Sequence, residues 1–175
     1  MQENLNVGVM TINMDQTDNG LIEKTCYENN EINCQTYGGL YTWDEAMLYK
    51  SGERSDICPT GWHIPSNEEW QELNDFLGRE MSGQKMKVSK AHNPTWDGEN
   101  SSGFTAIPSG VAYENRFGRL GFWAVYWTSS EKDENYAWST QLDNYWTMNK
   151  YPNLYHGNHF MKKNGFSIRC IKNNE

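Results

Sequence analysis

The stretch Cys58–Trp70 constrains the fold most, because it predicts a turn, a strand and a helix start within thirteen residues. A proline and a glycine break the chain early in it, and the bulky, partly β-branched residues 62–64 favour a short strand. Ser66 then precedes Glu69 by three residues, the spacing of a capping box, in which each side chain bonds the other's backbone N–H. We therefore expect a helix to begin directly after Ser66.

This predicted helix carries a single apolar stripe. Trp70, Leu73, Phe76 and Leu77 recur at three- and four-residue spacing, which is the period of one helix face. Gly78 is a plausible end, because glycine readily adopts the backbone conformation that terminates helices. We expect Trp70, Leu73 and Phe76 to be buried together on one side of the helix.

The same stretch belongs to an ordered set of motifs. The others lie at Glu3–Val7, Gly39–Met47, Gly103–Gly110 and Gly165–Cys170. Together these motifs resemble the Fibrobacter succinogenes major paralogous domain family, which belongs to the C-type-lectin-like superfamily, and the resemblance covers essentially the whole chain. It implies a single domain over residues 1–175 with an α+β, C-type-lectin-like fold. Two short helices are then expected in the first half, and a twisted antiparallel sheet with long loops in the second.

The resemblance also implies a cellular context. The family is known mainly from its sequences and its cell-surface setting, so we expect a secreted or surface-anchored bacterial protein, such as a lipoprotein. The family segment similar to residues 1–5 lies inside longer proteins, so Met1 is interpreted as a truncation point. We expect a monomeric domain of a longer surface protein that is not itself inserted into a membrane.

Four cysteines bear on the compartment. Cys26 and Cys34 flank a polar, turn-rich stretch, whereas Cys58 and Cys170 precede the expected central strand and end the last one. Four cysteines allow three pairings, and we favour 26–34 with 58–170. Reduced thiols or a metal site are the alternative, but there is no C-x-x-C motif and only His63 lies close in sequence to a cysteine. Disulfides imply an oxidising, extracytoplasmic location.

Charge and composition narrow the partners. The formal net charge of −8 repels nucleic acid and anionic lipid, and no basic run offsets it. No apolar run approaches the roughly 18 residues that a membrane span requires. Eight tryptophans and ten tyrosines are more than the core alone needs, so some are expected on the surface.

Further elements follow from local patterns. Residues 7–14 suit an early strand, and Thr42 can cap a helix that runs to about Lys50, with Trp43, Met47 and Ala46 inward. The residues between the first two cysteines are expected to form a loop.

In the second half, residues 92–103 are dense in chain breakers and predict a long loop. Residues 104–113 alternate like a strand that Pro108 interrupts, which favours an edge position or a bulge. The remaining strands are expected at 122–130, 136–142 and 165–171.

Enzymatic chemistry is weakly supported. The superfamily includes the formylglycine-generating enzymes, which need a reactive cysteine pair close together, whereas Cys170 is the only cysteine after Cys58. Ser109 lacks the leading glycine of a nucleophile elbow. His63 is interpreted as a hydrogen-bonded strand histidine. We therefore expect no enzyme activity and no cofactor.

Metal binding is equally weakly indicated. The Glu-Pro-Asn and Trp-Asn-Asp triplets of calcium-dependent lectins are absent. The oxygen-rich stretches 97–100 and 133–135 are explained as well by turns, although Ca²⁺ takes such ligands. His156 and His159 have a spacing that can serve a metal, but they have no acidic or thiol neighbour and Gly157 weakens a helix there. No metal site is predicted.

The segment 143–164 remains, rich in Tyr, Trp, Asn and His and poor in aliphatic residues. Such a composition is typical of binding loops, in which flat rings offer contact area and amides offer hydrogen bonds. Pro152 and Gly157 both disfavour one continuous strand, so part of the segment is expected to form a loop. The alternative is two ordinary strands joined by a hairpin, with alternate rings in the core. The candidate ligand-binding residues are Tyr145, Trp146, Asn149, Tyr151, Asn153, Tyr155, His156, Asn158 and His159.

These observations predict a non-enzymatic recognition module that binds a glycan or a protein ligand through this segment, without metal. A structural adhesin or fimbrial-type module with no small-ligand site is the alternative. A formylglycine-generating-like enzyme comes third, because the reactive cysteine pair is missing.

Overall fold

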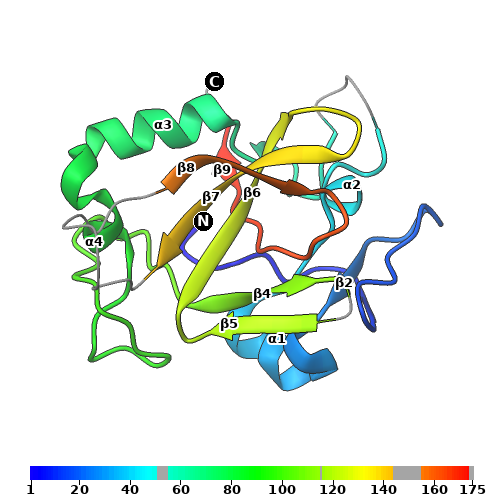
Figure 1. Ribbon diagram of the computed structural model, residues 1–175, viewed down its shortest axis with the longest axis horizontal. Coiled ribbons are helices and arrows are strands. Elements are labelled where there is room, and N and C mark those ends of the chain that lie inside the picture. The colour runs from blue at the N-terminus through cyan, green and yellow to red at the C-terminus, as the bar shows by residue number, and fades with distance from the viewer. Residues whose placement is uncertain (51–54, 115, 144–154, 174–175) are drawn as a thin grey trace.

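The computed structural model describes residues 1–50, 55–114, 116–143 and 155–173, with the side chains of 155–157 left out. It is a mixed α+β fold, with short helices early in the chain and a curled sheet in the second half (Figure 1). The helices are α1 (Glu31–Tyr37), α2 (Trp43–Ala46), α3 (Asn67–Phe76) and α4 (Ser82–Met86), with 3₁₀ turns at Tyr27–Asn29 and Arg79–Met81. The strands are β1 (Val9–Thr11), β2 (Glu23–Thr25), β3 (Trp62–His63), β4 (Ser109–Tyr113), β5 (Arg116–Leu120), β6 (Trp123–Glu131), β7 (Tyr136–Asp143), β8 (Tyr155–Met161) and β9 (Ile171–Lys172).

The main sheet has the strand order β5-β4-β6-β7-β8. Its neighbours are antiparallel except β4 and β6, which pair in parallel through Gly110 and Ala124. The prediction of a purely antiparallel sheet was therefore wrong, and the sheet is mixed. In Figure 1, α3 lies along one side of this sheet, whereas α1 lies beside the β4–β5 hairpin at the opposite end.

The position of β4 in the sheet differs from the one expected from Pro108. Pro108 was expected to place this strand at an edge or a bulge, but β4 begins at Ser109, one residue after the proline, and lies between β5 and β6. The missing N–H of proline therefore costs no ladder bond. The edge strand next to β4 is β5, a strand that the sequence patterns did not predict.

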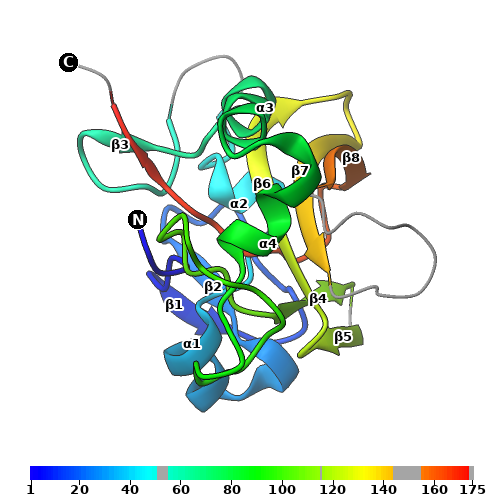
Figure 2. The same cartoon turned by 90° about the vertical axis from the view of Figure 1, so that its left-hand side faces the viewer.

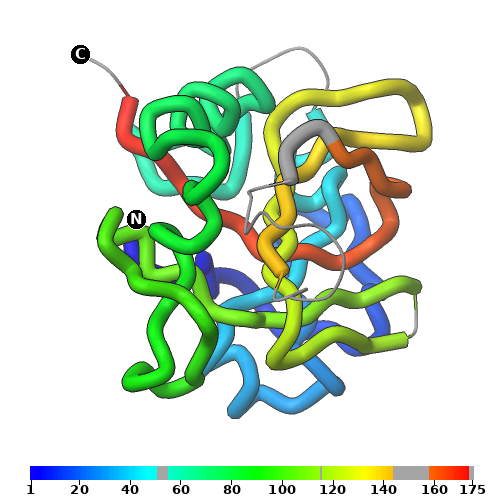
Figure 3. Tube along the Cα trace, turned by 60° about the vertical axis from the view of Figure 1, so that its left-hand side comes forward, coloured from blue at the N-terminus to red at the C-terminus, as the bar shows by residue number. Residues whose placement is uncertain are grey.

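The C-terminal segment does not form the continuous strand expected over residues 165–171. Gly165, Phe166 and Ser167 each make a single bridge, to Ala112, Tyr41 and Tyr126 respectively, and only Ile171–Lys172 forms a strand. The segment crosses the molecule beside the N terminus (Figure 3), where Leu5 N–H donates to Ile168 O at 2.9 Å. The C-terminal segment thus pairs with backbone from both halves of the sequence.

Both predicted disulfides are confirmed. Cys26 bonds Cys34 and Cys58 bonds Cys170, with Cα–Cα distances of 5.0 and 5.9 Å. The strand after Cys58 was expected to be central, but β3 pairs only with β9 in a separate two-stranded sheet, visible beside the C terminus in Figure 2. The stretch between Cys26 and Cys34 is not a loop, because a 3₁₀ turn and the first half of α1 occupy it.

The capping box at the start of α3 is confirmed in both directions: Ser66 Oγ accepts from Glu69 N, and Glu69 Oε2 accepts from Ser66 N. The helix ends where expected, with Gly78 at φ 78°. The helix from Thr42 is shorter than expected and ends at Ala46, because Leu48 and Tyr49 both adopt positive φ.

Two aromatic clusters fill the core on either side of β6. On one side Trp127 packs on Phe166, with ring centroids 4.4 Å apart. On the other, Trp70 of α3 stacks on Tyr126 at 5.5 Å and also contacts Phe104. The sheet is therefore buried on both faces at its centre.

The prediction for the apolar stripe of α3 was wrong at one position. Trp70 is buried and Leu73 is half-buried, but Phe76 is 84% exposed. Six residues beyond Trp70, Phe76 lies about 240° further around the helix axis and so faces away from the sheet. Asn74 and Leu77 take the buried places, and Asn74 Oδ1 accepts from Ser82 Oγ.

Candidate functional site

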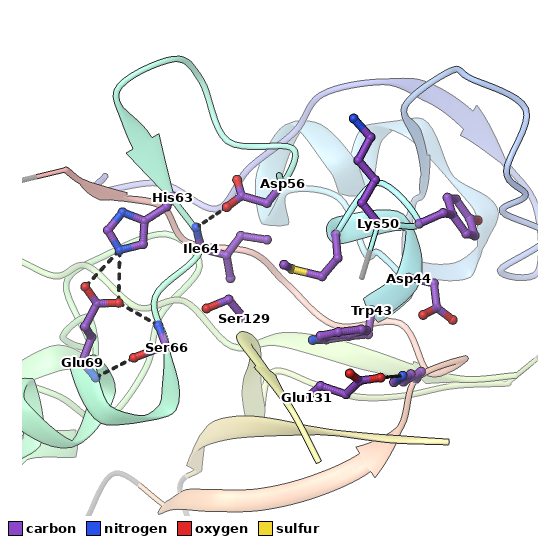
Figure 4. Close-up of a pocket in the computed structure, with 13 residues that line it drawn as sticks. Trp43, Asp44, Lys50, Asp56, His63, Ile64, Ser66, Glu69, Ser129 and Glu131 are labelled. Carbon is purple, nitrogen blue, oxygen red and sulfur yellow. Dashed lines mark hydrogen bonds and ion pairs between the residues drawn. The ribbon is translucent and has the colours of Figure 1, made fainter. Parts of the chain in front are cut away.

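A cleft of about 470 Å³ opens between α2, the β3–α3 connection and the end of β6 (Figure 4). Its apolar lining is Trp43, Met47 and Ile64, and its polar and aromatic rim is Asp44, Tyr49, Lys50, Asp56, His63, Ser66, Glu69, Ser129, Glu131 and Lys162. Two hydrogen bonds fix β6 against the start of α3: Ser129 N donates to Pro65 O at 2.9 Å, and Asn67 N donates to Ser130 Oγ at 3.0 Å. The cleft walls are therefore held together by the capped helix start.

On the β3–α3 side of the cleft the polar groups are already engaged. His63 Nε2 lies 2.9 and 3.1 Å from the two oxygens of Glu69, and Nδ1 lies 2.6 Å from Asn173 Oδ1. Asp56 accepts backbone N–H bonds from Cys58 at 2.8 Å and Ile64 at 3.1 Å. Because both ring nitrogens are engaged, His63 has no nitrogen to take a proton from a hydroxyl in the cleft.

The α2 side of the cleft is built around Trp43. Its Nε1 donates to Thr128 O at 2.9 Å, and the ammonium of Lys162 lies 4.6 Å from its ring centroid and pairs with Glu131. Half-buried Asp44 lies beside the Trp43 ring, as Figure 4 shows. Burial raises the pKa of Asp44, Glu131 raises it further, and Lys162 opposes the shift.

Behind the cleft, α2 also carries a buried carboxylate. Glu45 is 1% exposed, and its Oε1 accepts from Glu23 N at 2.8 Å. Burial raises the pKa of Glu45; the hydrogen bond from Glu23 N and the nearby Tyr49 hydroxyl oppose the shift, whereas the charges of Glu23 and Asp18 add to it. A raised carboxyl pKa means that the folded state holds the ionised form less well than the unfolded chain does.

We therefore expect Glu45→Gln to change the pH dependence of stability. Because the folded pKa lies above the ordinary value of 4.5, the stabilising contribution of Glu45 is fully present below about pH 4.5 and is lost as pH rises through the folded pKa. The glutamine keeps an oxygen for Glu23 N and removes the charge. Urea unfolding near pH 4 and near pH 8 should show the variant gaining stability relative to wild type at the higher pH. An equal difference at both values would contradict the assignment.

A second surface lies on the β7–β8 hairpin. His159 contacts Tyr136 and Trp138 edge to face, with ring centroids 5.8 and 5.6 Å away, and the ammonium of Lys132 lies 5.9 and 5.6 Å from the same two rings. We call Tyr136, Trp138, His159 and Lys132 the hairpin cluster. His159 is exposed, and the two aromatic rings are half-buried.

A groove of about 860 Å³ adjoins this cluster, between the turn that follows β4 and strand β8. Its lining is Tyr113, Glu114, Arg116, Tyr136, His159, Phe160, Met161 and Asn164. Tyr113 also packs against Phe160 at 6.4 Å, so rings continue from the hairpin cluster to the end of β4. The groove thus combines aromatic walls with a carboxylate, a guanidinium and an amide.

The sequence-predicted binding residues meet this surface only in part. Among them, Tyr145, Trp146, Asn149, Tyr151 and Asn153 lie outside the described residues. Tyr155 and His156 belong to β8 without described side chains, whereas half-buried Asn158 and exposed His159 are fully described. Of these two, His159 lines the groove and Asn158 does not.

Sequence reasoning missed Tyr136, Trp138 and Lys132 as surface groups. The signal was present for the two rings, because Tyr136 and Trp138 alternate with buried Ala137 and Ser139 and so share the outward face of β7. No comparable signal marks the cleft, whose walls come from residues more than a hundred positions apart in the sequence.

Metal-binding chemistry finds no support in the described part of the chain, where no group of three or more His, Cys, Asp or Glu side chains is placed to hold an ion. Asp97 instead pairs with Lys87 at 2.8 Å, and Asp133 Oδ1 caps a turn by accepting from Asn135 N and Tyr136 N. No helix in the described ranges is long and apolar enough to cross a membrane.

The fold and surfaces define a disulfide-stabilised α+β module of the kind suited to an oxidising, extracytoplasmic environment. The chain belongs to the family of the Fibrobacter succinogenes major domain, whose profile matches residues 1–172. Comparison with curated proteins and with solved structures found no match. The resemblance recognised from the motifs is thereby confirmed.

Proposed function

We propose that this domain is a non-enzymatic recognition module of a secreted or surface-anchored protein, such as a lipoprotein or adhesin, and that it binds a glycan in the groove beside β8. Family membership and the two disulfides support the extracytoplasmic setting. The observation that carries the binding proposal is the hairpin cluster, in which an exposed imidazole joins two half-buried rings at the border of the groove.

The chemistry of the groove suits a sugar. Aromatic rings offer rigid, flat contact area for the apolar C–H faces of a sugar at little entropic cost. Glu114, Arg116 and Asn164 supply acceptors and donors for hydroxyl groups along the same groove. Glu114 also pairs with Lys163, which lowers the pKa of its carboxyl and keeps it an acceptor.

The absence of catalysis in this proposal rests on how the candidate groups are used. All four cysteines form disulfides, so no thiol is available for oxidative or nucleophilic chemistry. Both ring nitrogens of His63 are engaged. Covalent catalysis needs a free nucleophile beside a free base, and neither the cysteines nor His63 supply these.

We further propose that the fold is C-type-lectin-like. In its support, α2 and α3 flank the β3 connection, and the Cys58–Cys170 bridge joins that connection to the C-terminal segment. The N-terminal and C-terminal segments also lie side by side, with Met1 N–H donating to Cys170 O at 2.9 Å.

A glycan array, read with and without a calcium chelator, identifies the ligand and tests its independence from metal. For the glycan found, we expect Tyr136→Ala and His159→Ala each to weaken binding at least about fivefold, the equivalent of ~1 kcal/mol at a contributing interface residue. Both side chains reach solvent, so the melting temperature should change little.

Phe122→Ala provides the matched control. Phe122 is a 58% exposed ring between β5 and β6, whereas the groove lies at the opposite end of β5, beside Arg116. Its affinity should equal that of wild type. Equal losses in all three variants, or losses of stability with affinity unchanged in the two groove variants, would place the binding site elsewhere. A protein ligand on the same face, with a silent array, would overturn the glycan assignment.

A further inference from the structure

The cleft of Figure 4 is separate from the groove and differs from it in charge. Its lining carboxylates, Asp44, Asp56, Glu69 and Glu131, outnumber its lysines by two among the described residues. Beneath them lie the apolar side chains of Trp43, Met47 and Ile64, of which Trp43 and Met47 keep 7% of their surface exposed and Ile64 none. An apolar surface bordered by negative charge favours a ligand that combines an aliphatic part with a cation.

Three of the four carboxylates are already satisfied within the protein. Asp56 accepts two backbone N–H groups, Glu69 binds His63 and the start of α3, and Glu131 pairs with Lys162. The fourth is different: no described group donates a hydrogen bond to the half-buried Asp44 carboxylate. A partly desolvated carboxylate of this kind gains from a cation brought to it.

The protein itself shows how such a cation can be accommodated. Lys162 comes from the segment after β8, extends over the face of Trp43 and ends on Glu131. Its ammonium is thus held by a ring face and a carboxylate at once, a combination that stabilises amines. Asp44 lies beside the Trp43 ring, as Figure 4 shows, and so adds a second carboxylate to this surface.

We propose that the cleft binds a lysine side chain of a partner protein, with the aliphatic stem against Met47 and the ammonium on Asp44. The cleft volume of about 470 Å³ falls in the range of small-ligand sites and leaves room for backbone beside the side chain. The formal net charge of −8 assists the approach of a basic partner segment.

The test uses a capped Gly-Lys-Gly tripeptide, the same peptide with norleucine in place of lysine, and n-pentylamine as a free amine. Binding is followed by amide and indole chemical-shift changes of labelled protein. The lysine peptide should bind saturably at the cleft, and both other probes should bind at least about fivefold more weakly. Equal binding of norleucine would remove the charge from the argument, and equal binding of pentylamine would make a free amine the ligand.

Asp44→Asn should weaken the lysine peptide at least about fivefold. Glu72→Gln, which removes the same charge from an exposed position of α3 outside the cleft, should leave its affinity unchanged. Equal effects of the two variants would reduce the interaction to overall charge, and an unaffected Asp44→Asn variant would overturn the assignment. If Asp44→Asn does not fold, the peptide affinity of Met47→Lys is compared with that of Met47→Leu. The added ammonium at position 47 should displace the peptide from the cleft. Undiminished binding to Met47→Lys would overturn the proposal. Tyr136→Ala should not alter this affinity, which separates this site from the glycan groove.

Discussion

Replacing Cys58 and Cys170 together with serine is expected to lower the free energy of unfolding by about 4–5 kcal/mol. The bridge closes a loop with a sequence separation of 112, and the loss of chain entropy in the unfolded state grows with the logarithm of that length. The native ladder between β3 and β9 has only two residues on each strand and cannot hold these ends together by itself. Urea unfolding followed by tryptophan fluorescence measures the change.

The other bridge is the matched control. Cys26 and Cys34 have a sequence separation of only 8, for which the same relation gives about 2–3 kcal/mol. The pair replaced at 26 and 34 should therefore remain clearly more stable than the pair replaced at 58 and 170. The reverse order would mean that native-state packing around each bridge, and not the length of the loop, decides its contribution.

The parts of the fold that sequence predicted are those fixed by local chemistry. The Ser66–Glu69 capping box specifies where α3 begins regardless of the surroundings, and the glycine at 78 specifies where it stops. The short runs of bulky residues at 122–130 and 136–142, separated by a charged turn, likewise placed β6 and β7 to within a residue.

What sequence could not predict depends on tertiary contacts. Helix α1 buries only Cys34, so it has no periodic apolar stripe to reveal it. The interruption of the C-terminal strand reflects bridges to three separate segments, near residues 41, 112 and 126. Arg169 belongs to the same passage: it is 2% exposed and bonds Asn4 Oδ1 and the carbonyls of Phe104 and Thr105.

The two candidate sites also differ in how far the sequence could predict them. Among the predicted residues whose side chains are described, His159 lies in the groove, and it was selected because its segment has the ring- and amide-rich composition of binding loops. The cleft could not be found, since Asp44, Glu131 and Lys162 carry no shared spacing and meet only when α2, β6 and the segment after β8 come together.

Trp70→Ala should destabilise the domain by about 3–5 kcal/mol, as expected for truncating a core aromatic side chain. Trp70 is 2% exposed, stacks on Tyr126 at 5.5 Å and contacts Phe104 at 5.6 Å, so the truncation leaves a cavity between α3 and the sheet. No described group accepts from its indole N–H, so the loss is one of packing and not of a hydrogen bond.

The same helix supplies the control that makes this measurement decisive. Phe76→Ala removes an aromatic ring of similar helix propensity from α3, but from a side chain that is 84% exposed, and it should change stability by no more than about 0.5 kcal/mol. Since the gain in helix propensity on going to alanine is comparable at both positions, the difference between the two variants reports burial alone. A costly Phe76→Ala would mean that this ring is covered in solution, by a partner or by a rotated helix. A mild Trp70→Ala would show that the cluster with Tyr126 and Phe104 is not the core that joins α3 to the sheet.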